Sequence, residues 1–443
     1  MSRNAVREGP YPYVIPLLFL GFILPVYFDI LSLQISGYRF VLLVFFIPAM
    51  IRWLDGSSRI HTIDILIICF GLWRVLAIFA NHGLISRWEF SGINFIETAA
   101  PYFIARWMIR DAHSFRVFVV WLFMVIAIML PFSAYQFLTD KSILLDFFAS
   151  LGGYQTQHYE PRLGFYRAQG SMPHPILFGI FCSAAFSLVW YTLGHGKGLY
   201  YTASRSGVVV AAVFTSLSSG AFFSVIVQVM LMAWNTVFAA VNKKWTKLFY
   251  LISGLYLFLE IFANRSGAQI FAAYMTLSKA SAWYRIHIFN YAIDDVFRNP
   301  IFGLGLKDWT RPSWMLPSVD NFWLVVAMRG GVPALALLLI VIILLYRNIG
   351  RAQLTGKLAS YRLGYLFALS GICIAAITVH LWDASFCFLM FLLGAGVWLI
   401  DAKNEDAQTQ DSLDLVRDRK IKYTRFGLEQ HTKGDLLDAD IKQ

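Results

Sequence analysis

Residues 332–346 read VPALALLLIVIILLY, and they contain no charged side chain. A second long apolar stretch covers residues 14–33, where Asp29 carries the only charge. A helix needs roughly 20 mainly apolar residues to cross the hydrocarbon layer of a membrane. Because stretches of this kind recur along the whole chain, the sequence predicts an all-α, polytopic integral membrane protein.

The composition points the same way. The 443 residues are 58% hydrophobic and 14% charged, whereas a soluble domain usually has about 25% charged residues. The net charge of +11 could suggest nucleic acid in a soluble protein, but these lysines and arginines lie mainly in short loops between apolar stretches. That arrangement is a topology signal, so we expect no nucleic-acid partner. The four cysteines lack the spacing of metal or redox sites, and no metal is expected.

We expect about twelve transmembrane helices in one domain over residues 1–401. They are predicted at 13–33, 39–54, 63–81, 90–108, 115–138, 173–193, 199–216, 219–241, 247–264, 321–346, 362–380 and 384–401. Lysine and arginine are concentrated at the N-terminus and in every second loop, which places both termini in the cytoplasm. The charged segment 402–443 is predicted to be a cytoplasmic tail.

Two loops are long, at about 139–172 and 265–320, and the same alternation places both outside the cytoplasm. Long loops with structure of their own are usually functional. Within the second loop, Ile286, Phe289, Ile293 and Val296 follow helical spacing. This spacing predicts an amphipathic helix over residues 283–297, lying on the outer face of the membrane.

The first long loop brings Arg162 and Arg167 shortly before His174, which stands at the start of a predicted span. Guanidinium groups suit phosphate oxygens and keep their charge at any working pH. Anchoring at the membrane interface is an equally good explanation for either arginine alone. His174 is a candidate general base.

The second long loop carries Arg285 and Arg311 and ends at Asp320 and Asn321. Asp320 is a candidate base or acceptor-orienting group. It could equally cap the following helix, as could Ser318 or Asn321.

Polar residues also occur between and within the apolar stretches. Ser218 and Ser219 interrupt one stretch, where small residues would let a helix or a lipid approach closely. Arg74 and Glu97 lie inside predicted spans, and such residues are usually paired. Arg74 and Glu97 could therefore form a buried ion pair between neighbouring helices, and helix packing explains such a pair at least as well as contact with a substrate.

Several of these segments resemble a known family. Residues 215–222 (TSLSSGAF), 284–291 (YRIHIFNY) and 299–305 (NPIFGLG) resemble motifs of the O-antigen ligase and polymerase superfamily. Residues 167–175 (RAQGSMPHP), 311–314 (RPSW) and 319–324 (VDNFWL) are similar to its exopolysaccharide polymerase branch. Together the motifs cover roughly residues 160–345 in the order that the family shows.

The resemblance implies a glycan substrate carried on undecaprenyl diphosphate in a bacterial inner membrane. A sugar hydroxyl of one molecule attacks the anomeric carbon of another, and the lipid diphosphate leaves, without a nucleotide or a metal cofactor. Such an enzyme acts on the periplasmic face and could work with a chain-length regulator or an export complex.

The same resemblance implies roles for individual residues. Arg285 with Arg162 or Arg167 would bind the diphosphate, and Asp320 or His174 would act on the acceptor. Arg311, Asn321, Ser218 and Ser219 would contact diphosphate or glycan.

Two departures from the family pattern bear on the reaction. Ligases of the superfamily often have arginine at the position of Ser219 and histidine at that of Asp320. These differences favour a polymerase of repeat units over a ligase that transfers a finished glycan. A transporter of lipid-linked glycan is the alternative from another class, but the sequence lacks the internal repeats typical of transporters.

Overall fold

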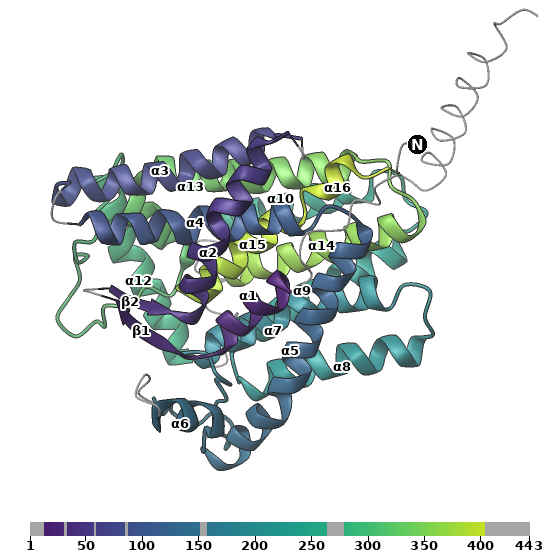
Figure 1. Ribbon diagram of the computed structural model, residues 1–443, viewed down its shortest axis with the longest axis horizontal. Coiled ribbons are helices and arrows are strands. Elements are labelled where there is room, and N and C mark those ends of the chain that lie inside the picture. Colours follow the sequence, from purple (N-terminus) through teal and green to yellow (C-terminus); the bar gives the residue numbers. More distant parts are fainter. Residues whose placement is uncertain are drawn as a thin grey trace, which may run out of the picture. The chain divides into compact units, whose positions relative to one another are not determined.

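The computed structural model describes residues 13–30, 33–56, 59–84, 87–150, 157–263 and 279–403. The predicted tail therefore lies outside the described residues from position 404 onward. Apart from one β-hairpin and isolated turns, the described elements are helices (Figure 1). Among them, nine are long and apolar enough to cross a membrane. The prediction of an all-α, polytopic membrane protein is confirmed.

These nine helices each overlap a predicted span for most of its length. They are α2 (Gly37–Leu54), α3 (Thr62–His82), α5 (Ala112–Thr139), α7 (Pro175–Leu188, continued by the π-helical turn Val189–Leu193), α9 (Ser219–Val237), α10 (Lys244–Phe262), α13 (Phe322–Arg351), α14 (Gly356–Ala375), and α15 (Ala384–Ala395) followed by α16 (Trp398–Asp401).

The three other predicted spans are also helical, but they are shorter or more polar. They correspond to α1 (Val14–Ile23), α4 (Trp88–Met108) and α8 (Leu199–Thr215). Helix α4 carries Glu89, Glu97 and Arg106, which lower its hydropathy. Helix α8 has 17 residues, slightly fewer than the roughly 20 that a perpendicular span needs.

The predicted span 13–33 is wrong in its second half. Helix α1 ends at Ile23, and strands β1 (Tyr27–Ile30) and β2 (Leu33–Ser36) then pair as an antiparallel hairpin. The cause is local: Leu24 has extended backbone angles (φ −88°, ψ 113°) and precedes Pro25. The ring of a proline disfavours helical geometry in the residue before it, so the helix cannot continue although the side chains remain apolar.

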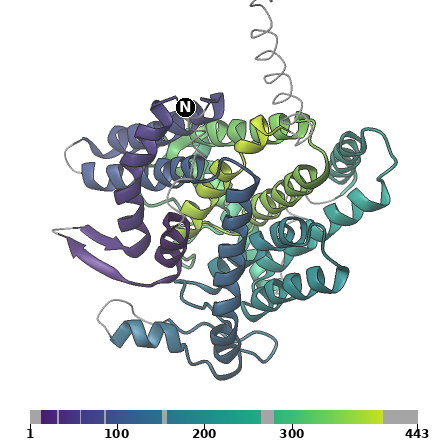
Figure 2. The same ribbon diagram turned by 45° about the vertical axis from the view of Figure 1, so that its right-hand side comes forward.

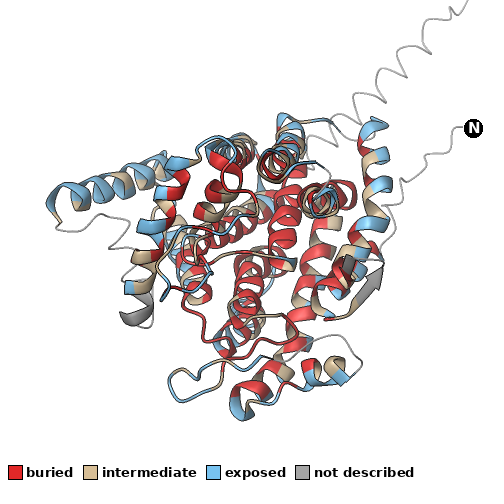
Figure 3. Ribbon diagram, turned by 90° about the vertical axis from the view of Figure 1, so that its left-hand side faces the viewer, coloured by how far each residue is buried: buried red, intermediate tan, exposed pale blue. Residues whose placement is uncertain are grey.

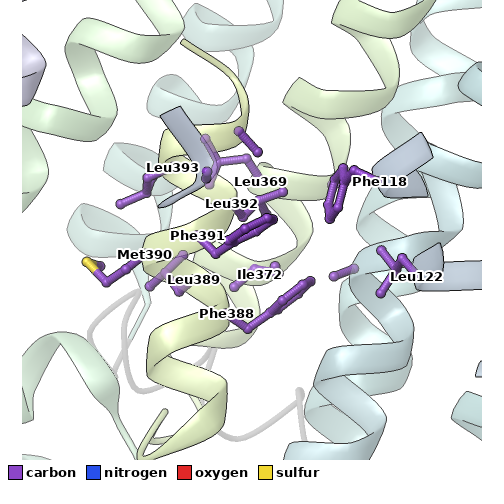
Figure 4. Close-up of a cluster of buried hydrophobic side chains, with 14 of the residues drawn as sticks. Phe118, Leu122, Leu369, Ile372, Phe388, Leu389, Met390, Phe391, Leu392 and Leu393 are labelled. Atoms are coloured by element: carbon purple, nitrogen blue, oxygen red, sulfur yellow. The ribbon is translucent and has the colours of Figure 1, made fainter. Parts of the chain in front are cut away.

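The helices pack in two neighbouring groups. Helices α2, α3, α4, α13 and α15 form one, and α7, α8, α9 and α14 form the other, with α5 against α1 and α8 (Figures 1 and 2). Helix α15 is buried on all sides, and Phe391 packs against Phe118 of α5 with ring centroids 5.5 Å apart (Figure 4). A helix that is apolar all round and buried forms the centre of a bundle.

The exposed surface is itself apolar. Helix α10 buries none of its residues, and its side chains Phe249, Leu251 and Phe258 are more than half exposed. Buried positions gather toward the middle of the bundle and exposed ones face outward (Figure 3). A soluble protein rarely exposes so continuous an apolar face, so lipid is the solvent that this surface requires.

A buried polar network joins three helices at one end of the bundle. The carboxylate of Asp64 on α3 is fully buried and accepts hydrogen bonds from Tyr102 Oη (2.6 Å) and Arg106 Nε (3.0 Å) of α4. Trp53 Nε1 of α2 donates to the same carboxylate at 3.2 Å. The Asp64 carboxylate is therefore the counter-charge of the buried Arg106 side chain.

We expect Asp64→Asn to destabilise the protein by about 3–5 kcal/mol, because it leaves the buried Arg106 without its counter-charge. Thermal unfolding in detergent would measure the change. The matched control is Asp55→Asn, which removes a partly exposed carboxylate 3.4 Å from Arg52, worth about 0–1 kcal/mol. Equal shifts in the two variants would show that the network does not hold these helices together.

Candidate active site

The two long loops meet at the same end of the bundle. In the first loop, helix α6 (Ile143–Ser150) precedes the segment that carries Arg162 and Arg167. In the second, helix α12 (Lys279–Arg298) confirms the helix predicted at 283–297, and its residues Ile288, Ala292 and Val296 pack into a buried cluster. Helix α12 lies against α13, and the charge of Asp320, two residues before α13 begins, acts on Arg285 of α12.

Three arginines of these loops are linked electrostatically, because the charge of Arg162 acts on both Arg167 and Arg285. Arg167 is 8% exposed, and its Nε and Nη2 atoms have no hydrogen-bond partner among the described residues. The same holds for Nε and Nη1 of Arg285. Burial, together with the nearby charge of Arg162, lowers the pKa of Arg167 to about 10. Unpaired buried cations are costly, and an anionic ligand with several oxygen atoms would compensate them.

Two hydrogen bonds to backbone carbonyl oxygens hold the segment that carries Arg162 and Arg167 against the end of α8 and the turn that follows it. Arg162 Nη1 donates to the carbonyl oxygen of Leu217 at 3.2 Å, and the amide of Ala168 donates to the Thr215 oxygen at 2.9 Å. Ser218 and Ser219, both buried, follow directly. The structure thus brings the two predicted serines next to Arg162.

His174 has a structural role that sequence reasoning did not assign to it. It is the N-cap of α7, where its Nδ1 accepts a hydrogen bond from the amide of Ile176 at 3.0 Å. Burial, together with the nearby charges of Arg167 and Arg162, lowers its pKa to about 4. The ring is therefore neutral near pH 7, and the cap bond assigns its proton to Nε2. With its lone pair occupied, His174 is a weak candidate for the base and a better candidate for a hydrogen-bond donor.

Asp320 does not cap the following helix. Asn321 is the N-cap of α13, and its side chain accepts from the amide of Leu324 at 3.1 Å. The explanation of Asp320 as a cap is therefore wrong, and the capping oxygen of Asn321 is engaged by the backbone. The Asp320 carboxylate makes no hydrogen bond and no close ion pair with any residue that the structure describes.

The pKa of Asp320 depends on its burial and on the nearby Arg285. Burial raises the pKa of Asp320, and Arg285 opposes that shift only in part. In turn, burial lowers the pKa of Arg285, Asp320 raises it, and Arg162 lowers it. These shared influences place Arg285 near both Asp320 and Arg162. We call Arg162, Arg167 and Arg285, with Asp320 and His174, the arginine cluster.

Arg311 is the predicted site residue that the structure places apart from this cluster. Its Nη1 donates to Asp308 Oδ1 at 2.6 Å, and its Nε donates to the Met315 carbonyl oxygen at 3.1 Å. Its guanidinium also lies over the ring of Trp309. These contacts hold the loop around residue 311 together and use the donors that a diphosphate would need.

The predicted ion pair between Arg74 and Glu97 is wrong. Glu97 accepts from Arg39 Nε at 2.8 Å, whereas Arg74 Nη1 donates to Thr98 Oγ1 at 2.7 Å. Arg39 lies in the first turn of α2, 58 residues from Glu97 along the chain, and no spacing in the sequence connects the two.

A cavity of about 630 Å³ lies beside the arginine cluster, and sequence reasoning did not find it. Its lining comes from the second half of α3 and from the first turns of α2, α4, α13 and α15. We call it the helix-end cavity. Its charged, histidine and aromatic lining includes Arg39, Arg74, Glu89, Phe90, Glu97, Phe322, Arg329, His380, Trp382 and Asp383. The ring of Trp382 contacts His174 of the arginine cluster (centroids 5.8 Å apart) and His380 of the cavity lining (5.6 Å). Trp382 therefore connects the two sites.

The arrangement supports chemistry on an anionic, polar substrate at one face of a membrane. The arginines can hold phosphate oxygens, and Asp320 can accept a proton or orient a hydroxyl group. No family model matches the sequence, and a search of curated proteins finds no significant relative.

Proposed function

We propose that this protein is a membrane glycosyltransferase that joins oligosaccharide repeat units carried on undecaprenyl diphosphate. One observation carries the proposal: Arg167 and Arg285, from two separate loops, have buried guanidinium nitrogens without a partner among the described residues, and the charges of Asp320 and Arg162 both act on Arg285. The resemblance of both loops to exopolysaccharide polymerases supports the same assignment. The lysine and arginine alternation supports a site on the periplasmic face of a bacterial inner membrane.

In this reaction the oxygen of an acceptor hydroxyl forms a bond to the anomeric carbon of the donor sugar. The bond between that carbon and the phosphate oxygen breaks, and the lipid diphosphate leaves with the electron pair. Negative charge develops on the diphosphate in the transition state, where fixed cations stabilise it most effectively. Arg285 with Arg162 and Arg167 would supply these cations.

Asp320 would receive the proton of the attacking hydroxyl. A general base works best when its pKa approaches the working pH. Burial raises the pKa of Asp320 in that direction, which strengthens its case relative to His174. The polyprenyl tail of the donor would lie in lipid beside the bundle.

The lipid-linked glycan that accumulates when the protein is deleted tests this proposal. A polymerase leaves single repeat units on the lipid, because the next step in chain growth is missing. A finished long chain on the lipid would indicate a ligase. Polymer retained inside the cell, with normal repeat units, would indicate a transporter. Restoring the wild-type chain on a plasmid should reverse the accumulation.

A further inference from the structure

The helix-end cavity contains two arginines, Arg74 and Arg329, that form no ion pair with the residues that the structure describes. Arg39 is compensated by Glu97 at 2.8 Å and Asp383 at 3.5 Å. Arg74 donates to a threonine hydroxyl, and Arg329 Nη1 donates to the carbonyl oxygens of Gly305 (3.1 Å) and Lys307 (2.7 Å). Within the part of the chain that the structure describes, neither Arg74 nor Arg329 forms an ion pair, although Glu89 lies on the same cavity lining.

The remaining lining combines aromatic rings with hydrogen-bonding groups. Phe90, Phe322 and Trp382 supply apolar surface, and Nδ1 of His380 is buried without a partner among the described residues. Burial lowers the pKa of His380 to about 4, so its ring is neutral near pH 7. Pockets of several hundred Å³ with aromatic walls and a few placed polar groups are typical of small-molecule sites. Sugars suit such a lining, because their ring faces are apolar and their edges carry hydroxyl groups.

We propose that the helix-end cavity binds an acidic sugar of the acceptor glycan, with the sugar carboxylate held by Arg74 and Arg329 and the ring packed near Trp382. The identification of this sugar as the acceptor rests on the proposed function. Arginine binds carboxylates through two parallel hydrogen bonds. Phe322 of the lining follows Asp320 by two residues, so an acceptor seated here would extend from the cavity toward the proposed base.

The charges on the lining favour a carboxylated sugar over a second diphosphate. Glu89, Glu97 and Asp383 would repel a group with two or more negative charges. The same carboxylates accept hydrogen bonds from sugar hydroxyls. A single carboxylate with several hydroxyl groups therefore matches the lining better than a phosphate does.

Binding to the purified full chain in detergent tests this proposal without any turnover. Methyl glucuronide is the probe, methyl glucoside is its neutral counterpart, and saturation-transfer NMR measures the affinity of each. We expect the wild-type chain to bind the glucuronide on the order of tenfold to a hundredfold more tightly, as a charge-assisted pair predicts. Inorganic diphosphate should compete poorly. Equal binding of the two sugars, no binding of either, or strong competition by diphosphate would overturn the proposal.

Two substitutions then locate the site. Arg74→Gln should weaken glucuronide binding by a similar factor and leave glucoside binding unchanged. The matched control is Arg205→Gln, since Arg205 lies over Tyr201 on α8 and not on the cavity lining, and it should bind like wild type. An Arg74→Gln chain that melts like wild type and keeps its preference for the glucuronide would contradict the assignment.

Failure of this proposal can be told from failure of the proposed function. Arg285→Ala changes the arginine cluster but not the cavity, and it should keep glucuronide binding. If the wild-type chain shows no preference for the glucuronide while single repeat units accumulate in the deletion strain, the sugar site in the cavity is rejected and the polymerase function is kept. Binding that depends on Arg74, without any such accumulation, would keep the cavity and reject the polymerase.

Discussion

Arg285→Ala is expected to abolish polymer synthesis while the protein stays in the membrane at its normal level. The charges of Asp320 and Arg162 both act on Arg285, and two of its nitrogens are buried without a partner among the described residues. Removing one preorganised donor to a developing negative charge typically lowers kcat by about 10²–10³-fold. Polymer yield and turnover of purified lipid-linked repeat units would measure the loss.

Two further variants sharpen this test. Arg285→Lys should rescue poorly, because lysine keeps the charge but lacks the planar pair of donors. Arg298→Ala is the matched control on the same helix, since the Arg298 side chain is 61% exposed and lies 3.6 Å from Asp295. Wild-type polymer from Arg285→Ala at equal expression would remove Arg285 from the site.

Asp320→Asn is expected to give stable, membrane-inserted protein with turnover lowered by about 10²–10⁴-fold, the range for a missing general base. An effect on helix capping is not expected, because Asn321 caps α13. Asp294→Asn is the matched control, since it removes an exposed carboxylate from the same long loop. Near-normal turnover by the Asp320→Asn variant would exclude Asp320 from the chemistry.

The dependence of the rate on pH adds a second readout for Asp320. A base must be unprotonated, so the wild-type rate should fall as the pH drops through the pKa of Asp320. Burial raises that pKa above the ordinary carboxyl value, which is about 3.9, so the fall should begin at a higher pH than for an exposed aspartate. The residual rate of the Asn variant should lack this fall. An unchanged acidic limb in the variant would assign it to another group.

The helices were predictable from the sequence because crossing a membrane requires length and apolar character, and both can be read along the chain. The β-hairpin after α1 has the same apolar composition as a span, so hydropathy could not distinguish it. The sequence signal for the break was local, in Leu24 before Pro25. The restriction that Pro25 places on Leu24 is what ends the helix before the apolar stretch ends.

The site was predictable only in part. The alternation of charged loops predicted that both long loops lie on one side of the membrane, and in the structure the charge of Arg162 in the first loop acts on Arg285 in the second. Which residue caps α13, and which arginines lack partners, depends on contacts across the fold. The helix-end cavity combines residues as distant as Arg74 and Arg329, and no spacing along the chain connects them.

The central claim is that this chain joins lipid-linked repeat units at the arginine cluster, and the most direct measurement uses the purified protein. Wild-type chain in lipid nanodiscs would be incubated with a single repeat unit on undecaprenyl diphosphate, without nucleotide sugar. We predict a ladder of longer lipid-linked glycans and one free undecaprenyl diphosphate for each bond formed, with both products lost in Arg285→Ala. Unchanged substrate with well-folded wild-type protein, or a ladder that Arg285→Ala forms equally well, would contradict the account.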